Sequence, residues 1–81
     1  MDHALRSRIT SNSKIFGGQP IIRGLRFRVT DVLEYLAAGE TRQSLLKEFS
    51  FLEDEDITAS LNFAAEMTSH RLVAAERKLH L

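Results

Sequence analysis

Cysteine and tryptophan are absent from this 81-residue chain, and glycine and proline are scarce, with four and one residues. Without cysteine, the chain has no disulfide, no thiolate zinc site and no cysteine nucleophile. No apolar run approaches the ~20 residues that a membrane span requires, and residues 1–13 lack the apolar core of a signal peptide. These absences predict a cytoplasmic protein of one small domain that does not enter the membrane.

Patterns typical of catalysis and metal binding are also missing. His3, His70 and His80 lie near the chain ends, and none has a second ligand three or four residues later. The acidic run 53–56 lacks the spacing of a calcium loop, and Gly17-Gly18 is not followed by the Gly-Lys-Ser/Thr of a phosphate loop. We therefore expect no catalytic residues, no metal and no cofactor, and a protein that is not an enzyme.

The net charge of zero conceals a division of charge along the chain. Residues 1–28 contain six arginine or lysine residues against one aspartate, whereas residues 29–81 contain five basic residues against ten acidic ones. Such a division indicates a basic arm that meets a polyanion, two halves that meet each other, or ordinary solvated charge.

Glycine and proline are confined to the first half of the chain, and none follows Gly39. The N-terminal third is therefore predicted to be extended and rich in turns, and the remainder helical. Within residues 14–29 the alternation of polar and apolar residues predicts a short β-ribbon. Phe27 and Val29 would face the core, with Arg26 and Arg28 on the opposite side.

Three helices follow the ribbon in the predicted order. The first spans 30–38, with Thr30 as its N-cap and Gly39 as the left-handed residue after its last turn. The second spans 42–49 and is capped by Thr41. Two helices joined by a three-residue turn that contains glycine have the spacing of a helix-turn-helix.

The third helix is predicted to run from about 54 to about 79, because apolar residues recur there every three or four positions. It exceeds what a small domain needs, so residues 69–81 are expected to project from a bundle of residues 1–68 as a partner-binding segment. The fold class is mainly α, a small helical bundle with a short N-terminal ribbon and a long C-terminal helix. The expected core comprises Ile22, Phe27, Val29, Val32, Leu33, Leu36, Leu45, Leu46, Phe49, Ile57 and Leu61.

A helix-turn-helix raises the possibility of DNA binding. The acidic start of the third helix argues against that helix as the element that contacts the bases. Four carboxylates at residues 53–56 would be repelled by phosphates. Any DNA contact is therefore expected from the basic N-terminal third, with a slope of log K against log salt of about −4 to −5 per protomer. The candidate DNA-binding residues are Arg6, Arg8, Lys14, Arg23, Arg26 and Arg28.

The stretch IFGGQPIIRGLRFRV at residues 15–29 is the most specific motif in the chain. It resembles the "GGxPxIxGTRIxV" opening of a small prokaryotic family, the domain of unknown function four-three-three. VLEYLAAGETRQSLLKEF and FLEDEDITASLNFAAE resemble the family's following segments, so the resemblance covers about residues 9–67. Leu25, Phe27 and Ser50 stand where the family usually has Thr, Ile and Pro.

The resemblance implies a homeodomain-like helical bundle and a function as a VapB-type antitoxin of a type II toxin–antitoxin pair. Such a protein neutralises a PIN-like ribonuclease toxin and binds operator DNA, as a homodimer or with the toxin. PIN-type nucleases gather carboxylates around Mg²⁺, which basic side chains of the C-terminal segment could pair. The candidate toxin-binding residues are Arg71, Leu72, Val73, Arg77, Lys78 and Leu79.

Other interpretations of the sequence remain open. The basic residues of the C-terminal segment could be solvated charges that favour the helix dipole. The whole chain could be a stand-alone DNA-binding regulator, or a structural module that homo-oligomerises through its long helix. A gene for a small nuclease beside this one would favour the antitoxin.

Overall fold

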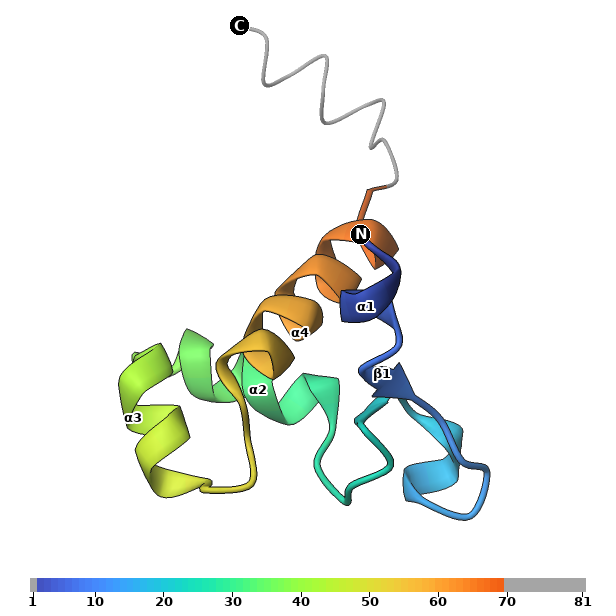
Figure 1. The fold of residues 1–81 in the computed structure, drawn as a ribbon, viewed down its shortest axis with the longest axis horizontal. Coiled ribbons are helices and arrows are strands. Elements are labelled where there is room, and N and C mark those ends of the chain that lie inside the picture. The colour runs from blue at the N-terminus through green and yellow to red at the C-terminus, as the bar shows by residue number, and fades with distance from the viewer. Residues whose placement is uncertain (1, 70–81) are drawn as a thin grey trace, which may run out of the picture.

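The computed structural model describes residues 2–69 and is mainly helical, as the sequence predicts, with one small antiparallel sheet (Figure 1). The elements in chain order are α1 (His3–Arg6), β1 (Ile9–Thr10), the short 3₁₀ turn η1 (Phe16–Gly18), β2 (Ile21–Ile22), α2 (Val29–Ala37), α3 (Arg42–Glu48) and α4 (Asp54–Met67). Within the described residues, no helix is long and apolar enough to cross a membrane.

Helix α4 is the element on which the others assemble. It packs against α1 and β1 on one side and against α2 and α3 on the other, as Figure 1 shows. The beginning and the end of the described chain therefore lie side by side, with α1 next to the C-terminal half of α4.

The β-ribbon exists, but its first strand lies earlier than predicted. Strand β1 pairs antiparallel with β2, placing Ile9 opposite Ile22 and Thr10 opposite Ile21. The prediction that both strands fall within residues 14–29 is therefore wrong, although a single further pair joins Ile21 to Arg28. The chain returns to β2 through a loop in which Gly17 and Gly18 have positive φ, and this loop separates the two strands.

The described N-terminal segment begins with the helix α1, which corrects the prediction that the N-terminal third is extended and rich in turns. The Asp2 carboxylate accepts hydrogen bonds from the amides of Ala4 and Leu5 at 2.6 and 3.1 Å, and so caps α1. Arg6 then pairs with Glu66 of α4 at 2.7 Å. A short helix alone is marginal in water, so these contacts with α4 are what hold α1 in place.

Helix α2 begins one residue earlier than predicted, and Thr30 is not its N-cap. The N-cap is Arg28, whose amide donates to the Asp31 carboxylate at 2.9 Å. The pairing of Arg28 with Ile21 keeps the chain extended up to that residue, so the helix starts directly after it. Gly39 follows the helix with φ 101°, which confirms its predicted left-handed role.

The predicted second helix is confirmed as α3, together with its cap. The Thr41 hydroxyl accepts a hydrogen bond from the amide of Ser44 at 3.0 Å, and the Ser44 hydroxyl accepts from the amide of Thr41 at 2.9 Å. This reciprocal pair satisfies two donors at the helix start.

The prediction of one uninterrupted helix to residue 79 is wrong, because α4 ends at Met67. The Thr68 hydroxyl donates to the carbonyl of Ala64 at 2.8 Å, and that of Ser69 donates to Glu66 at 2.8 Å. Such bonds compete with continuation of the helix, and Met67 is 62% exposed, so packing does not favour a further turn. Residues 70–81, with all the candidate toxin-binding side chains, lie outside the described residues.

Ten of the eleven predicted core residues are buried or partly buried around one hydrophobic cluster. The exception is Leu61, which is 42% exposed. The buried face of α4 is centred near Ser60 rather than on the line from Ile57 to Leu61, so polar Asp56 and Ser60 are fully buried. Leu52, which was not predicted, completes the cluster.

Candidate functional site

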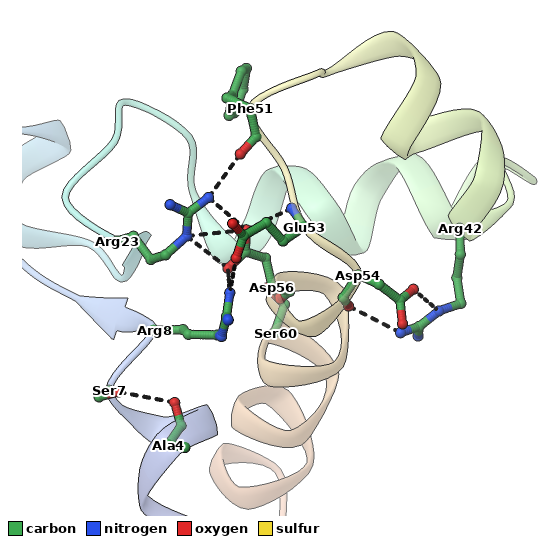
Figure 2. A network of polar contacts seen from close by, with 10 residues as sticks. All are labelled: Ala4, Ser7, Arg8, Arg23, Arg42, Phe51, Glu53, Asp54, Asp56 and Ser60. Carbon is green, nitrogen blue, oxygen red and sulfur yellow. Dashed lines mark hydrogen bonds and ion pairs between the residues drawn. The ribbon is translucent and has the colours of Figure 1, made fainter.

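Two arginines from the N-terminal third converge on one carboxylate of α4 (Figure 2). Arg23 donates to Asp56 through Nε at 3.0 Å and through Nη2 at 2.9 Å. Arg8 donates through Nη1 to Oδ1 of the same carboxylate at 2.9 Å, the oxygen that also accepts from Nε of Arg23. We call Arg8, Arg23 and Asp56 the Asp56 junction. It ties β1 and the turn after β2 to the start of α4.

Asp56 is the third residue of α4, and its position in the first turn explains how it can be buried as an anion. Its carboxylate also accepts the amide of Glu53 at 2.9 Å, and its carbonyl accepts the hydroxyl of Ser60 at 2.9 Å. Burial raises the pKa of Asp56, but the hydrogen bonds from Arg23, Glu53 and Arg8 outweigh burial and hold that pKa below its usual range. The carboxylate is therefore ionised and fully partnered at neutral pH.

The turn that delivers Arg23 to this carboxylate is strained. Arg23 has φ 43°, a left-handed conformation that costs a residue with a side chain about 1–3 kcal/mol. Its Nη2 also donates to the carbonyl of Phe51 at 2.8 Å. The guanidinium thus bridges the loop before α4 and the helix itself, and these bonds hold the strained turn in place.

Further ion pairs surround the junction and occupy most of the acidic start of α4. Arg8 also pairs with Glu53 at 2.6 Å. Arg42 of α3 pairs with Asp54 at 2.9 Å and donates to the hydroxyl of Thr58, as Figure 2 shows for the Asp54 contact. The acidic run therefore joins α4 to its neighbours, in addition to its effect on the helix dipole.

Four of the six candidate DNA-binding residues form ion pairs within the protein. Arg6, Arg8 and Arg23 pair with acids of α4 or its N-cap, and Arg28 pairs with Asp31. The oppositely charged halves of the chain thus meet each other, one of the alternatives that the charge division left open. The other two of the six candidates, Lys14 and Arg26, form no ion pair within residues 2–69.

An exposed aromatic ring lies beside Arg28, on the loop that carries the glycine pair. Phe16 is 42% exposed, and the Arg28 guanidinium lies 5.1 Å from the centre of its ring. Arg28 is held in turn by Asp31 at 2.7 Å, and this bond lowers the pKa of Asp31. Phe16 was not identified as a candidate from the sequence. Its position directly before Gly17-Gly18 was the only feature that could have marked it.

A second group of aromatic residues lies where α2 meets the loop between α3 and α4. Phe27 packs against Tyr35, Phe49 and Phe51, with ring centres 6.4, 4.9 and 5.4 Å apart. Tyr35 and Phe51 are 36% and 44% exposed, so one edge of the group reaches the surface. Asp31, Glu34, Tyr35 and Ala38 line a shallow depression of about 260 Å³ beside it.

The functional residues that sequence reasoning missed are the buried polar ones. Asp56 was assigned to an acidic run at the start of a helix, and Ser60 was not singled out. Asp56 and Ser60 are four residues apart and so share one face of the helix. A search for apolar periodicity counts only apolar residues, so it does not detect such a buried polar pair. Within residues 2–69, no cluster of three or more metal-binding side chains is present.

One curated relative matches the chain. The uncharacterized protein y4eO of Sinorhizobium fredii is 36% identical over 61 residues, which cover 75% of this chain and 28% of that protein. The chain thus spans less than a third of the length of this relative. No solved structure matches the chain. The family model described as "Protein of unknown function (DUF433)" matches residues 9–64, which contain the ribbon, Arg23 and Asp56 of the junction and most of α4, and the chain belongs to this family.

Proposed function

We propose that the protein is an antitoxin that neutralises a PIN-like ribonuclease through residues 70–81. The observation that carries this proposal is the position of the core. All residues of the described hydrophobic cluster lie between Ile9 and Phe63, and α4 ends at Met67. We assign partner binding to the segment that follows the described cluster and α4 in the sequence.

The charge of the two parts of the chain supports the same proposal. Residues 2–69 contain eight basic and ten acidic residues, whereas residues 70–81 contain three basic residues and one acid. The segment also carries Leu72, Val73, Leu79 and Leu81. A short chain that is both cationic and apolar is suited to a nuclease site in which carboxylates bind Mg²⁺. Arg71, Arg77 and Lys78 are the proposed cations, and Leu72, Val73 and Leu79 the apolar contacts.

The test uses the full chain and the product of a neighbouring gene for a PIN-like ribonuclease, a gene that the proposal requires. We expect the chain to inhibit RNA cleavage and to bind the nuclease in calorimetry. Reversing two segment charges with R77E and K78E should weaken binding at least about tenfold, because each buried hydrogen-bonded charge is worth about 2–5 kcal/mol at an interface. K47E, a charge reversal at an exposed position of α3, is the matched control and should bind the nuclease normally. Equal inhibition by the double variant would refute the proposal.

We further propose that the protein binds operator DNA, as a dimer or in its complex with the toxin. The arrangement of α2, a short turn through Gly39 and α3 supports a helix-turn-helix. Because only Lys14 and Arg26 of the six candidate residues have no ion pair within residues 2–69, we expect a slope of log K against log salt of about −2 per protomer, not the −4 to −5 predicted from about five phosphate contacts. Titrations at several salt concentrations measure this slope. A slope near zero would refute DNA binding.

A further inference from the structure

The outer side of the hairpin formed by residues 20–29 carries Arg28, which pairs with Asp31, and Arg26, which forms no ion pair among residues 2–69. Ile22 donates to the carbonyl of Phe27 at 2.9 Å, and Val29 donates to that of Pro20 at 3.0 Å. Phe27 and Val29 are buried. Side chains alternate between the two sides of an extended strand, so Arg28, between Phe27 and Val29, lies on the opposite side. Arg26 is exposed in the bend two residues before Arg28. We call Phe16, Arg26 and Arg28 the outer hairpin face.

Phe16 is held on this face by its backbone and by Arg28. Phe16, Gly17 and Gly18 have φ of 49°, 62° and 87° in succession. Left-handed backbone is strained for phenylalanine, and such strain persists where the surrounding structure requires it. A Cβ added at Gly17 would meet nothing within 4 Å, so glycine is favoured there by its positive φ and not by a lack of space. The η1 turn lies at the outer edge of the molecule (Figure 1).

The two arginines of the outer hairpin face have different partners and therefore different roles. Arg28 donates three hydrogen bonds to Asp31 and covers one side of the Phe16 ring, so it positions the ring. Its charge is balanced by Asp31. Arg26 is exposed and has no ion pair among residues 2–69, so it is the cation on this face that can contact a phosphate.

We infer that the outer hairpin face binds DNA by stacking one base on Phe16 while Arg26 contacts a neighbouring phosphate. Aromatic rings bind bases of any sequence, because every base has a flat apolar surface. In a duplex this requires one base step to open, as it does for apolar side chains that act as wedges. The inference rests on the operator-binding part of the proposed function, and its ligand is a DNA duplex opened at one step.

The test compares three probes of one mixed sequence: a paired duplex, the same duplex with one unpaired base, and one strand alone. Fluorescence anisotropy with the full chain measures binding at low salt. An unpaired base removes the energy of unstacking, so we expect the second probe to bind about tenfold more tightly than the first. F16A should abolish this preference, and F16W should retain it.

Two further variants separate the two contacts. R26A should weaken binding to all probes alike and make the salt slope less steep by about 1. F51A is the matched control, because Phe51 is as exposed as Phe16 but lies in the other aromatic group. It should leave the probe preference unchanged. Thermal melting of each variant checks that it is folded.

Each contrary result has a distinct meaning. If the wild-type chain binds DNA and F16A keeps the preference, the stacking inference is wrong and operator binding stands. If the wild-type chain binds no probe, with or without the toxin, both are wrong. Tighter binding to the single strand than to the duplex with the unpaired base would overturn the duplex ligand. Loss of toxin binding in F16A with intact DNA binding would assign the face to the protein partner.

Discussion

Arg23 and Arg26 are three positions apart in one turn, yet they lie in different environments. Arg23 is strained, points to α4 and donates three hydrogen bonds to a fully buried carboxylate. Arg26 is exposed and has no ion pair within the described chain. The Asp56 junction thus uses charge to join distant parts of the fold, whereas the outer hairpin face presents charge to solvent. Charge counted along the sequence does not distinguish these two uses.

Removal of the shared carboxylate should have the largest effect on stability. We expect D56A to lower the free energy of unfolding by about 3–5 kcal/mol, because two arginines would lose their buried partner. D54A is the control, since Asp54 forms an exposed pair with Arg42, and exposed pairs contribute about 0–1 kcal/mol. Urea denaturation of both variants measures the difference. Equal losses would show that the junction is no stronger than a surface pair.

The two arginines of the turn provide the direct comparison of the regions. R23A should lower the free energy of unfolding by about 1.5–3 kcal/mol, the range for hydrogen bonds to a charged group. R26A should change it by no more than about 0.5 kcal/mol, as exposed substitutions usually do. The same denaturation experiment tests both. A large loss in R26A would mean that this side chain supports the fold, and would leave the outer hairpin face without its free cation.

The junction should contribute to the pH dependence of stability, together with Asp31 and Asp54, whose pKa values are also lowered by their arginine partners. The pKa of Asp56 is lower in the folded than in the unfolded chain, so the unfolded chain binds more protons in acid. The stabilisation is complete above the ordinary aspartate pKa of about 3.9 and is lost as pH falls through the lower folded value. Denaturation between neutral and acidic pH should therefore show a steeper decline for the wild type than for D56N. Parallel curves would contradict this origin.

The smallest effect is expected where a cation of the N-terminal segment pairs at the surface. Arg6 pairs with Glu66, and its side chain is 60% exposed. R6A should lower the free energy of unfolding by less than about 1 kcal/mol, and added salt should reduce the difference. A loss comparable to that of R23A would indicate that α1 depends on this pair far more than its exposure suggests.

Much of the fold could be predicted from local sequence. Thr41 and Gly39 mark the ends of helices by chemistry that acts within a few residues, and both roles are confirmed. Thr30 failed as a cap because Arg28 pairs with Ile21, a contact made seven residues away. The end of α4 at Met67 was missed because apolar periodicity continues where packing against the body does not.

The sequence by itself determined the class of the fold, most of the core and the division of charge, because these depend on composition, periodicity and local capping. Only the tertiary structure decided which charges are used within the protein. Arg8 and Asp56 are 48 residues apart, and their pairing exists because α4 packs against β1 and the turn after β2. That packing buries Asp56 and Ser60 while it exposes Leu61, the reverse of what their polarity alone predicts.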